Sequence, residues 1–195
     1  MEKSIETKRQ IIEATKALVK VKPNLTVKDI CSKAYVNNAS INYHFGDKRN
    51  LMNIVLKEMI DEFKAYFIEQ LEKNDDLGVE ETIELIITIV YKFSMNNKGM
   101  IRYLFSSDEN GISQENVGIL QNFLFKDAFF DTVMKKLIKQ TKDTDINVIY
   151  AKYMVLFSSM CLPMVIEYTS QNSEPTLSKD LMKEYVKLLE KVMMA

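Results

Sequence analysis

Short polar side chains gather between residues 37 and 48, on a stretch whose pattern predicts a short helix and the start of a longer one. Such side chains can reach the hydrogen-bonding edges of bases in the major groove of DNA, and a small apolar one can touch a thymine methyl. The candidates for base contact are Asn38, Ala39, Ser40 and Asn42. The candidates for donating hydrogen bonds to phosphates are Tyr43, His44 and Lys48. These residue types favour contact with double-stranded DNA; an interior histidine and asparagines that only face water are the alternatives.

Two short helices joined by a tight turn would position these side chains. Thr26 is a good N-cap for a helix over residues 26–34, and Asp29 follows it at the spacing of a capping box. Asn37 is a good N-cap for the second helix. Such a pair is typical of a helix-turn-helix, whose second helix lies in the major groove.

The elements on either side complete a small helical domain. A helix over residues 3–20 precedes the pair and ends at the break over residues 22–24, which contains a proline. Ile41 and Phe45, four positions apart, would anchor the second short helix to the core. Asp47 can cap the long helix that follows.

The charge distribution fits this arrangement. Residues 1–50 contain 10 Lys and Arg against 5 Asp and Glu, a net charge of +5, whereas residues 51–195 contain 16 against 22, a net charge of −6. The whole chain has a net charge of −1, which excludes a uniformly basic nucleic-acid coat. A basic module on an acidic body suits a polyanionic partner.

The residues that catalysis needs are scarce. His44 is the one histidine, so no His-based zinc motif can form, and no Gly-rich phosphate loop is present. Cys31 and Cys161 lie 130 positions apart and are expected to be small buried apolar residues. The sequence therefore predicts neither an enzyme nor a bound cofactor or metal. No leader and no membrane helix are expected, which indicates a cytoplasmic protein.

The rest of the chain predicts further helices. With 195 residues, 5 Gly and 3 Pro, the composition favours helix over strand. The apolar spacing predicts helices over residues 48–73, 79–97, 99–106, 114–139, 146–171 and 177–194. The expected fold is all-α with about nine helices. A helix-turn-helix domain would cover residues 1–50, and a helical bundle that dimerises would cover residues 51–195.

The sequence resembles the TetR family of bacterial repressors. The resemblance rests on Tyr43-His44-Phe45, with Lys48 three positions on and Leu51 three further, and covers about residues 8–55. It implies that the residues at helix starts face the DNA backbone, namely Thr26 and Asn37. It implies that Asn38, Ala39, Ser40 and Asn42 read bases, and that Tyr43, His44 and Lys48 hold phosphates. One departure is Tyr35, at a turn position that the family usually fills with Gly.

The resemblance also assigns two roles to the remaining helices. A helix-turn-helix needs two copies to reach two half-sites, and the family pairs its subunits through the last two helices. The candidate interface residues are Ile149, Tyr153, Leu156, Phe157, Met160, Met164, Tyr168, Leu181, Tyr185, Leu188, Leu189 and Val192. The family's body usually encloses a small-molecule pocket, for which plain core packing is the alternative. The candidate lining residues are Tyr91, Met95, Met100, Tyr103, Phe105, Phe123, Phe129, Phe130, Met134 and Met154.

Taken together, the residues and the resemblance predict a homodimeric DNA-binding transcriptional regulator. The expected form is a repressor that a small, largely apolar ligand releases from a palindromic operator. Two alternatives remain open at this point. One is a dimeric DNA-binding protein without an effector, and the other is a small-molecule-binding helical protein that has lost DNA binding.

Overall fold

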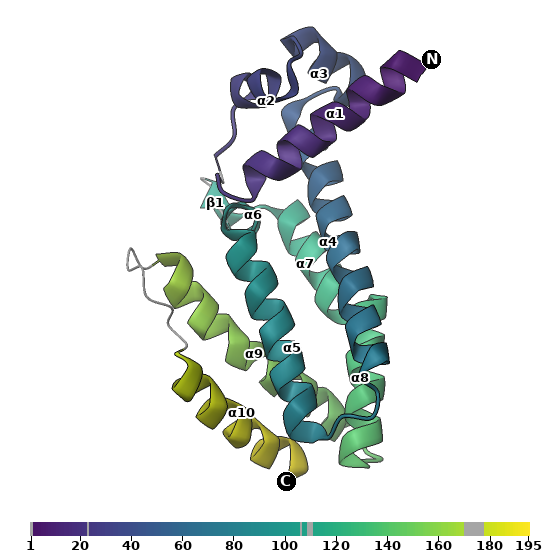
Figure 1. Cartoon of the computed structure of the whole chain (residues 1–195), viewed down its shortest axis with the longest axis vertical. Coiled ribbons are helices and arrows are strands. Elements are labelled where there is room, and N and C mark those ends of the chain that lie inside the picture. Colours follow the sequence, from purple (N-terminus) through teal and green to yellow (C-terminus); the bar gives the residue numbers. More distant parts are fainter. Residues whose placement is uncertain (1, 23, 106, 109–110, 170–177) are drawn as a thin grey trace. The chain divides into compact units, whose positions relative to one another are not determined.

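The computed structural model describes residues 2–22, 24–105, 107–108, 111–169 and 178–195 (Figure 1). Over these residues the chain forms ten helices and one antiparallel pair of two-residue strands. The all-α fold class is thereby confirmed. The helices are α1 (Glu2–Val19), α2 (Val27–Ala34), α3 (Asn38–Phe45), α4 (Lys48–Lys73), α5 (Val79–Asn96), α6 (Lys98–Leu104), α7 (Gln114–Phe125), α8 (Ala128–Thr141), α9 (Ile146–Thr169) and α10 (Lys179–Met194). The strands are β1 (Ser107–Asp108) and β2 (Gly111–Ile112).

One expected helix is in fact two. The stretch over residues 114–139 divides into α7 and α8, because Asp127 adopts an extended conformation and its side chain accepts a hydrogen bond from the Ala128 N–H at 2.7 Å. Asp127 is also paired with Lys64 Nζ at 2.5 Å. A capping aspartate competes with the helical conformation, so the apolar periodicity continues across a real break.

The described residues fall into two compact units. Unit 1 is Met1–Phe63 with Met95–Leu120, and unit 2 is Lys64–Ser94 with Gln121–Ala195. Helix α4 is continuous from unit 1 into unit 2. The contacts thus divide the chain within α4 and add residues 95–120 to the N-terminal unit, whereas a functional boundary after residue 50 stays a prediction.

In unit 1 a buried lysine joins α1 to α4. The Lys16 ammonium lies 2.6 Å from Glu62 and 2.9 Å from Glu58, and the Lys16 side chain is almost fully buried. Burial alone would lower the pKa of Lys16, but the hydrogen bonds to Glu62 and Glu58 outweigh it and hold the pKa above its usual value. Lys16 is therefore charged at neutral pH and ties the helix-turn-helix region to α4.

A close backbone contact joins α6 to the end of α1, also within unit 1. The Gly99 N–H donates a hydrogen bond to the Lys20 carbonyl at 2.8 Å. A Cβ at position 99 would lie 2.3 Å from the Val19 carbonyl oxygen and 2.6 Å from the Lys22 nitrogen. Only glycine allows α6 to begin this close to the segment that follows α1.

Unit 2 is built around aromatic side chains. The Phe129 ring lies 4.4 Å from the rings of both Phe67 and Phe123 and 5.3 Å from the ring of Phe157. These contacts join α4, α7, α8 and α9 within the unit. The buried Tyr153 hydroxyl donates to the Leu124 carbonyl at 2.5 Å.

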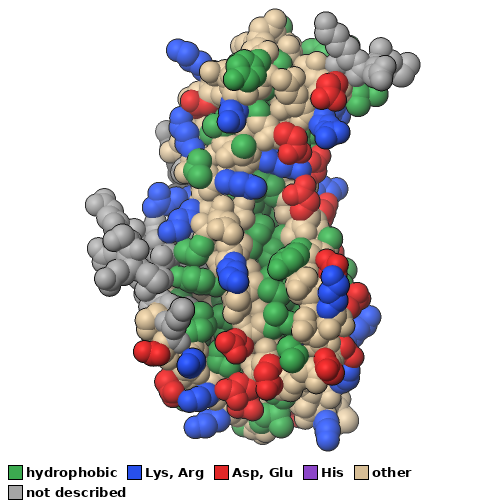
Figure 2. Space-filling view, in the orientation of Figure 1, with side chains coloured by type: hydrophobic (Ala, Val, Ile, Leu, Met, Phe, Trp, Pro, Cys, Tyr) green, Lys and Arg blue, Asp and Glu red, His purple; other side chains and the backbone are tan. Residues whose placement is uncertain are grey.

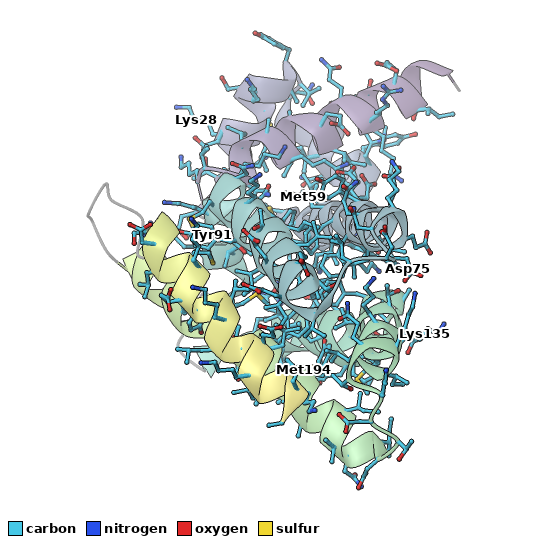
Figure 3. The ribbon with its side chains drawn as sticks, turned by 60° about the horizontal axis from the view of Figure 1, so that its bottom comes forward. Lys28, Met59, Asp75, Tyr91, Lys135 and Met194 are labelled. Atoms are coloured by element: carbon cyan, nitrogen blue, oxygen red, sulfur yellow. The ribbon has the colours of Figure 1, made fainter. Side chains whose placement is uncertain are left out.

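Helices α9 and α10 lie side by side (Figures 1 and 3). The buried Lys152 on α9 donates to Asp143 at 2.6 Å and to the Met193 carbonyl on α10 at 2.5 Å. The hydrogen bond from Lys152 holds the pKa of Asp143 below its usual value. The Tyr185 hydroxyl on α10 also donates to the Ser159 carbonyl on α9. Polar bonds in the middle and at the C-terminal end of α10 therefore fix the two helices against each other.

Candidate nucleic-acid interface

Helix α2 begins with the predicted capping box. The Thr26 hydroxyl accepts from the Asp29 N–H at 3.1 Å and donates to the Asp29 carboxylate at 2.7 Å, and the Thr26 N–H donates to that carboxylate at 2.8 Å. Lys22 pairs with Asp29 at 2.8 Å. The hydrogen bonds from Lys22 and Thr26 hold the pKa of Asp29 well below its usual range. The Thr26 side chain is thus engaged in the cap, and the Asp29 carboxylate occupies the N-terminus of α2.

The turn between α2 and α3 carries the residue that departs from the family pattern. Tyr35 has φ 54° and ψ 39°, the left-handed region, and its N–H donates to the Cys31 carbonyl. The Tyr35 side chain is 89% exposed. For a residue with a Cβ this conformation costs roughly 1–2 kcal/mol. The turn therefore keeps the left-handed conformation expected of a glycine, and Tyr35 bears the strain of adopting it.

Helix α3 begins at its predicted cap and presents two rows of side chains. The Asn37 side-chain oxygen accepts from the Ser40 N–H at 2.9 Å and from the Ser40 hydroxyl at 3.0 Å. Ile41 and Phe45 are buried as expected. The exposed side chains form two pairs at a spacing of four, which neighbour each other along the helix. They are Asn38 with Asn42, and Ala39 with Tyr43.

The three residues predicted to hold phosphates differ in exposure. Tyr43 is 79% exposed, and its ring meets the half-buried His44 ring edge-on at 4.9 Å. Lys48 is half-buried, and its ammonium donates to the Leu25 carbonyl at 2.7 Å. An ammonium has three donors, so Lys48 keeps capacity for a further acceptor. Its bond to the segment before α2 is a structural role that the sequence did not indicate.

The nine predicted DNA-binding residues therefore lie together in unit 1 but divide by what their side chains do. Those of Thr26, Asn37, Ser40 and Lys48 hold the local structure. Those of Asn38, Ala39, Asn42 and Tyr43 are exposed and make no hydrogen bond within the described residues. The ninth, His44, is half-buried between the rings of its two neighbours in the chain. Lys28 is exposed on α2 and points outward (Figure 3). An exposed lysine can hold a phosphate, and exposed amides can read base edges.

The predicted interface residues do not share one surface. Most of those on α9 are buried inside unit 2, because α9 packs an apolar stripe against the aromatic side chains of α7 and α8. The buried or half-buried side chains are Ile149, Tyr153, Leu156, Phe157, Met160, Tyr185 and Leu189. The exposed ones are Leu181, Leu188 and Val192, all on α10. The side chains of Met164 and Tyr168 lie outside the described part of the chain.

The predicted pocket residues also differ from one another. Phe129, Met134 and Met100 are buried, whereas Phe105 and Met154 are exposed, so these last two do not line an enclosed cavity. The half-buried ones are Tyr91, Met95, Tyr103, Phe123 and Phe130. Burial raises the pKa of Tyr103, with a further contribution from the charge of Glu115. On the visible face, apolar side chains reach the surface between charged ones (Figure 2).

Comparison with solved structures bears on this architecture. The chain matches a candidate TetR-family transcriptional regulator from Mesorhizobium loti with a TM-score of 0.71, over 98% of this chain and 96% of that one, at 16% identity. The chain has a TetR-like fold. No protein-family model matches the sequence, and no curated protein matches it. At this identity the likeness concerns the TetR-like fold and does not extend to the side chains of the candidate interface.

Neither a membrane-spanning helix nor a metal site is found in the part of the chain that the structure describes. No helix there combines the length and apolar character that crossing a membrane requires. No group of three or more His, Cys, Asp and Glu residues there is placed to hold a metal ion.

Proposed function

We propose that the protein is a cytoplasmic, homodimeric transcriptional regulator that binds a palindromic DNA operator. The observation that carries the proposal is the helix-turn-helix of unit 1, in which Asn38 and Asn42 lie exposed beside each other on α3. An asparagine can make two hydrogen bonds to the edge of adenine in the major groove. The net charge of +5 over residues 1–50 supplies attraction to phosphates that such readout requires. The proposal needs no catalytic residue.

Pairing of two copies through α9 and α10 belongs to the proposal. Leu181, Leu188 and Val192 on α10 are about half exposed, as is Met154 on the neighbouring α9. Burial of these apolar side chains against a second copy removes them from water. The interface is isologous, since one patch meets the same patch related by a two-fold axis. Two copies then present two α3 helices to half-sites about 34–36 Å apart or a multiple of it.

Release by a small, largely apolar ligand is the second part of the proposal. The half-buried aromatic and Met side chains of the body are adaptable enough to receive one. A ligand shifts DNA affinity only by its different affinity for two states of the dimer, typically about 1–3 kcal/mol. Helix α4 continues from unit 1 into unit 2 and is the element through which the shift would pass.

Selection of bound sequences from a random duplex pool, with the purified chain at moderate salt, tests the proposal. We expect a near-palindrome to be enriched, with a half-site spacing set by the dimer. Adding apolar compounds to the complex then separates a ligand-released repressor from a DNA-binding protein without an effector. If no sequence is enriched at any salt concentration and no duplex is bound, DNA-binding regulation is wrong for this chain.

Asn42→Ala should weaken operator binding mainly at particular base pairs, because Asn42 is exposed on α3 and its amide supports no bond inside the chain. The expected cost is about 1–3 kcal/mol at the base pair it contacts.

Lys28→Gln, in the same unit, is the variant to compare with Asn42→Ala. It should weaken binding to operator and random DNA alike and lower the salt dependence, since it removes one cation near phosphates. Fluorescence anisotropy on both duplexes, over a range of salt, measures both effects.

An equal loss on operator and random DNA for Asn42→Ala would contradict base readout. Lys48→Ala is a poorer test of phosphate contact than Lys28→Gln. The Lys48 ammonium also bonds the Leu25 carbonyl, so its loss perturbs the helix-turn-helix itself.

A further inference from the structure

Tyr35 combines backbone strain with an exposed side chain. Tyr35 and Lys142 are the two residues other than glycine with positive φ in the described part of the chain. Strain of this kind persists where something outweighs it. Within the described residues the Tyr35 ring makes no ring contact and its hydroxyl makes no hydrogen bond, and the side chain is 89% exposed. The backbone hydrogen bonds of the turn to the Cys31 carbonyl hold this conformation, but the Tyr35 side chain itself contributes no packing that would offset the strain.

The position of Tyr35 suggests a role for its exposed side chain. It ends α2 and lies two residues before Asn37, the N-cap of α3. In a helix-turn-helix the first helix crosses the DNA backbone, and the N-terminal residues of the second contact base edges. The turn between them therefore passes close to the sugar-phosphate strand. A phenol there can donate a hydrogen bond to a phosphate oxygen, as tyrosines in protein–DNA interfaces do.

We propose that Tyr35 is a positioning contact to DNA, whose hydroxyl donates to a backbone phosphate beside the groove that α3 enters. This inference rests on the proposed DNA binding and adds a contact that a glycine at this position lacks. A hydrogen bond at the turn fixes the angle at which α3 enters the groove, because it holds the chain immediately before the α3 cap. The contact is uncharged, so it adds affinity without displacing a counterion.

Tyr35→Phe removes only the hydroxyl. We expect affinity to fall roughly tenfold on both operator and random DNA, because a dimer loses one hydrogen bond at each of its two helix-turn-helix regions. The slope of log affinity against log salt should stay that of the wild type, which distinguishes this contact from a lysine contact. Tyr66→Phe is the control, because Tyr66 is an exposed tyrosine of unit 2. The DNA affinity of this variant should equal that of the wild type.

Tyr35→Gly separates the contact from the strain. It should raise Tm by roughly 2–4 °C, because the left-handed strain is released, and yet weaken DNA binding at least as much as Tyr35→Phe. A turn residue with no DNA contact would give the higher Tm with unchanged binding.

The outcomes keep this proposal apart from the function on which it rests. A wild-type chain that binds no DNA would overturn both. A wild-type chain that binds while Tyr35→Phe binds equally well would overturn only the Tyr35 contact. A loss confined to the operator would mean that Tyr35 reads a base, and would overturn the phosphate assignment.

Discussion

Gly99→Ala is expected to lower the free energy of unfolding by about 2–3 kcal/mol, a cost at the upper end for overpacking. The added methyl group would lie 2.3 Å from the Val19 carbonyl oxygen, 2.6 Å from the Lys22 nitrogen and 2.8 Å from the Val21 carbonyl carbon. All three are backbone atoms, which cannot turn aside as a flexible side chain can. Helix α6 must move away, and the hydrogen bond from Gly99 to Lys20 is then stretched or lost. Urea denaturation followed by circular dichroism measures the change.

Gly118→Ala provides the matched control. Gly118 lies in α7, and a Cβ there would meet nothing within 4 Å. Alanine is favoured over glycine inside a helix by about 1 kcal/mol, so this variant should be more stable than the wild type. The same substitution is therefore expected to act in opposite directions at two helical sites. Equal midpoints for the two variants would show that α6 does not approach the end of α1 as closely as described.

Leu188→Lys is expected to convert the proposed dimer into monomers and to remove operator binding at nanomolar protein. Leu188 is 59% exposed on α10, so the substitution should leave the fold of one chain intact. In an isologous interface each substitution occurs twice, and loss of a central apolar anchor costs about 2 kcal/mol or more per copy, or roughly 1,000-fold in the dimer dissociation constant overall. Light scattering coupled to gel filtration measures the mass, and anisotropy measures operator binding.

Lys183→Ala is the control on the same helix. Lys183 is exposed, and its removal deletes charge without adding any to an apolar patch. This variant should remain dimeric and bind the operator as the wild type does. If Leu188→Lys stayed dimeric with full affinity, the pairing surface would have to lie elsewhere than on this face of α10.

The elements of the helix-turn-helix could be predicted because their signals are local. The caps at Thr26 and Asn37 depend on a side chain and a backbone N–H three residues away, so spacing alone identifies them. The left-handed turn at Tyr35 is equally local. The break at Asp127 had the same kind of signal, an aspartate before an apolar run, but the continuous periodicity concealed it.

Contacts between distant segments could not be predicted in this way. Nothing near Lys48 indicates that its ammonium bonds the Leu25 carbonyl, and nothing near Gly99 indicates the end of α1. The stripe through Ile149 and Tyr153 has the spacing of an interface, yet it lies inside unit 2. Periodicity shows that a helix has an apolar face but does not show whether that face packs within its own chain or against another.

On α3 the residues that hold the structure are different from those that are exposed, and this separation has an evolutionary consequence. Asn37 and Ser40 hold the helix start, and Ile41 and Phe45 fix the helix to the core. The exposed pairs of side chains support none of this, and substitutions at such surface positions usually change stability by less than about 0.5 kcal/mol. The two tasks are therefore carried by separate sets of residues on one short helix. Under the proposed function, a lineage of such proteins can drift from one operator to another by single substitutions, with every intermediate still folded.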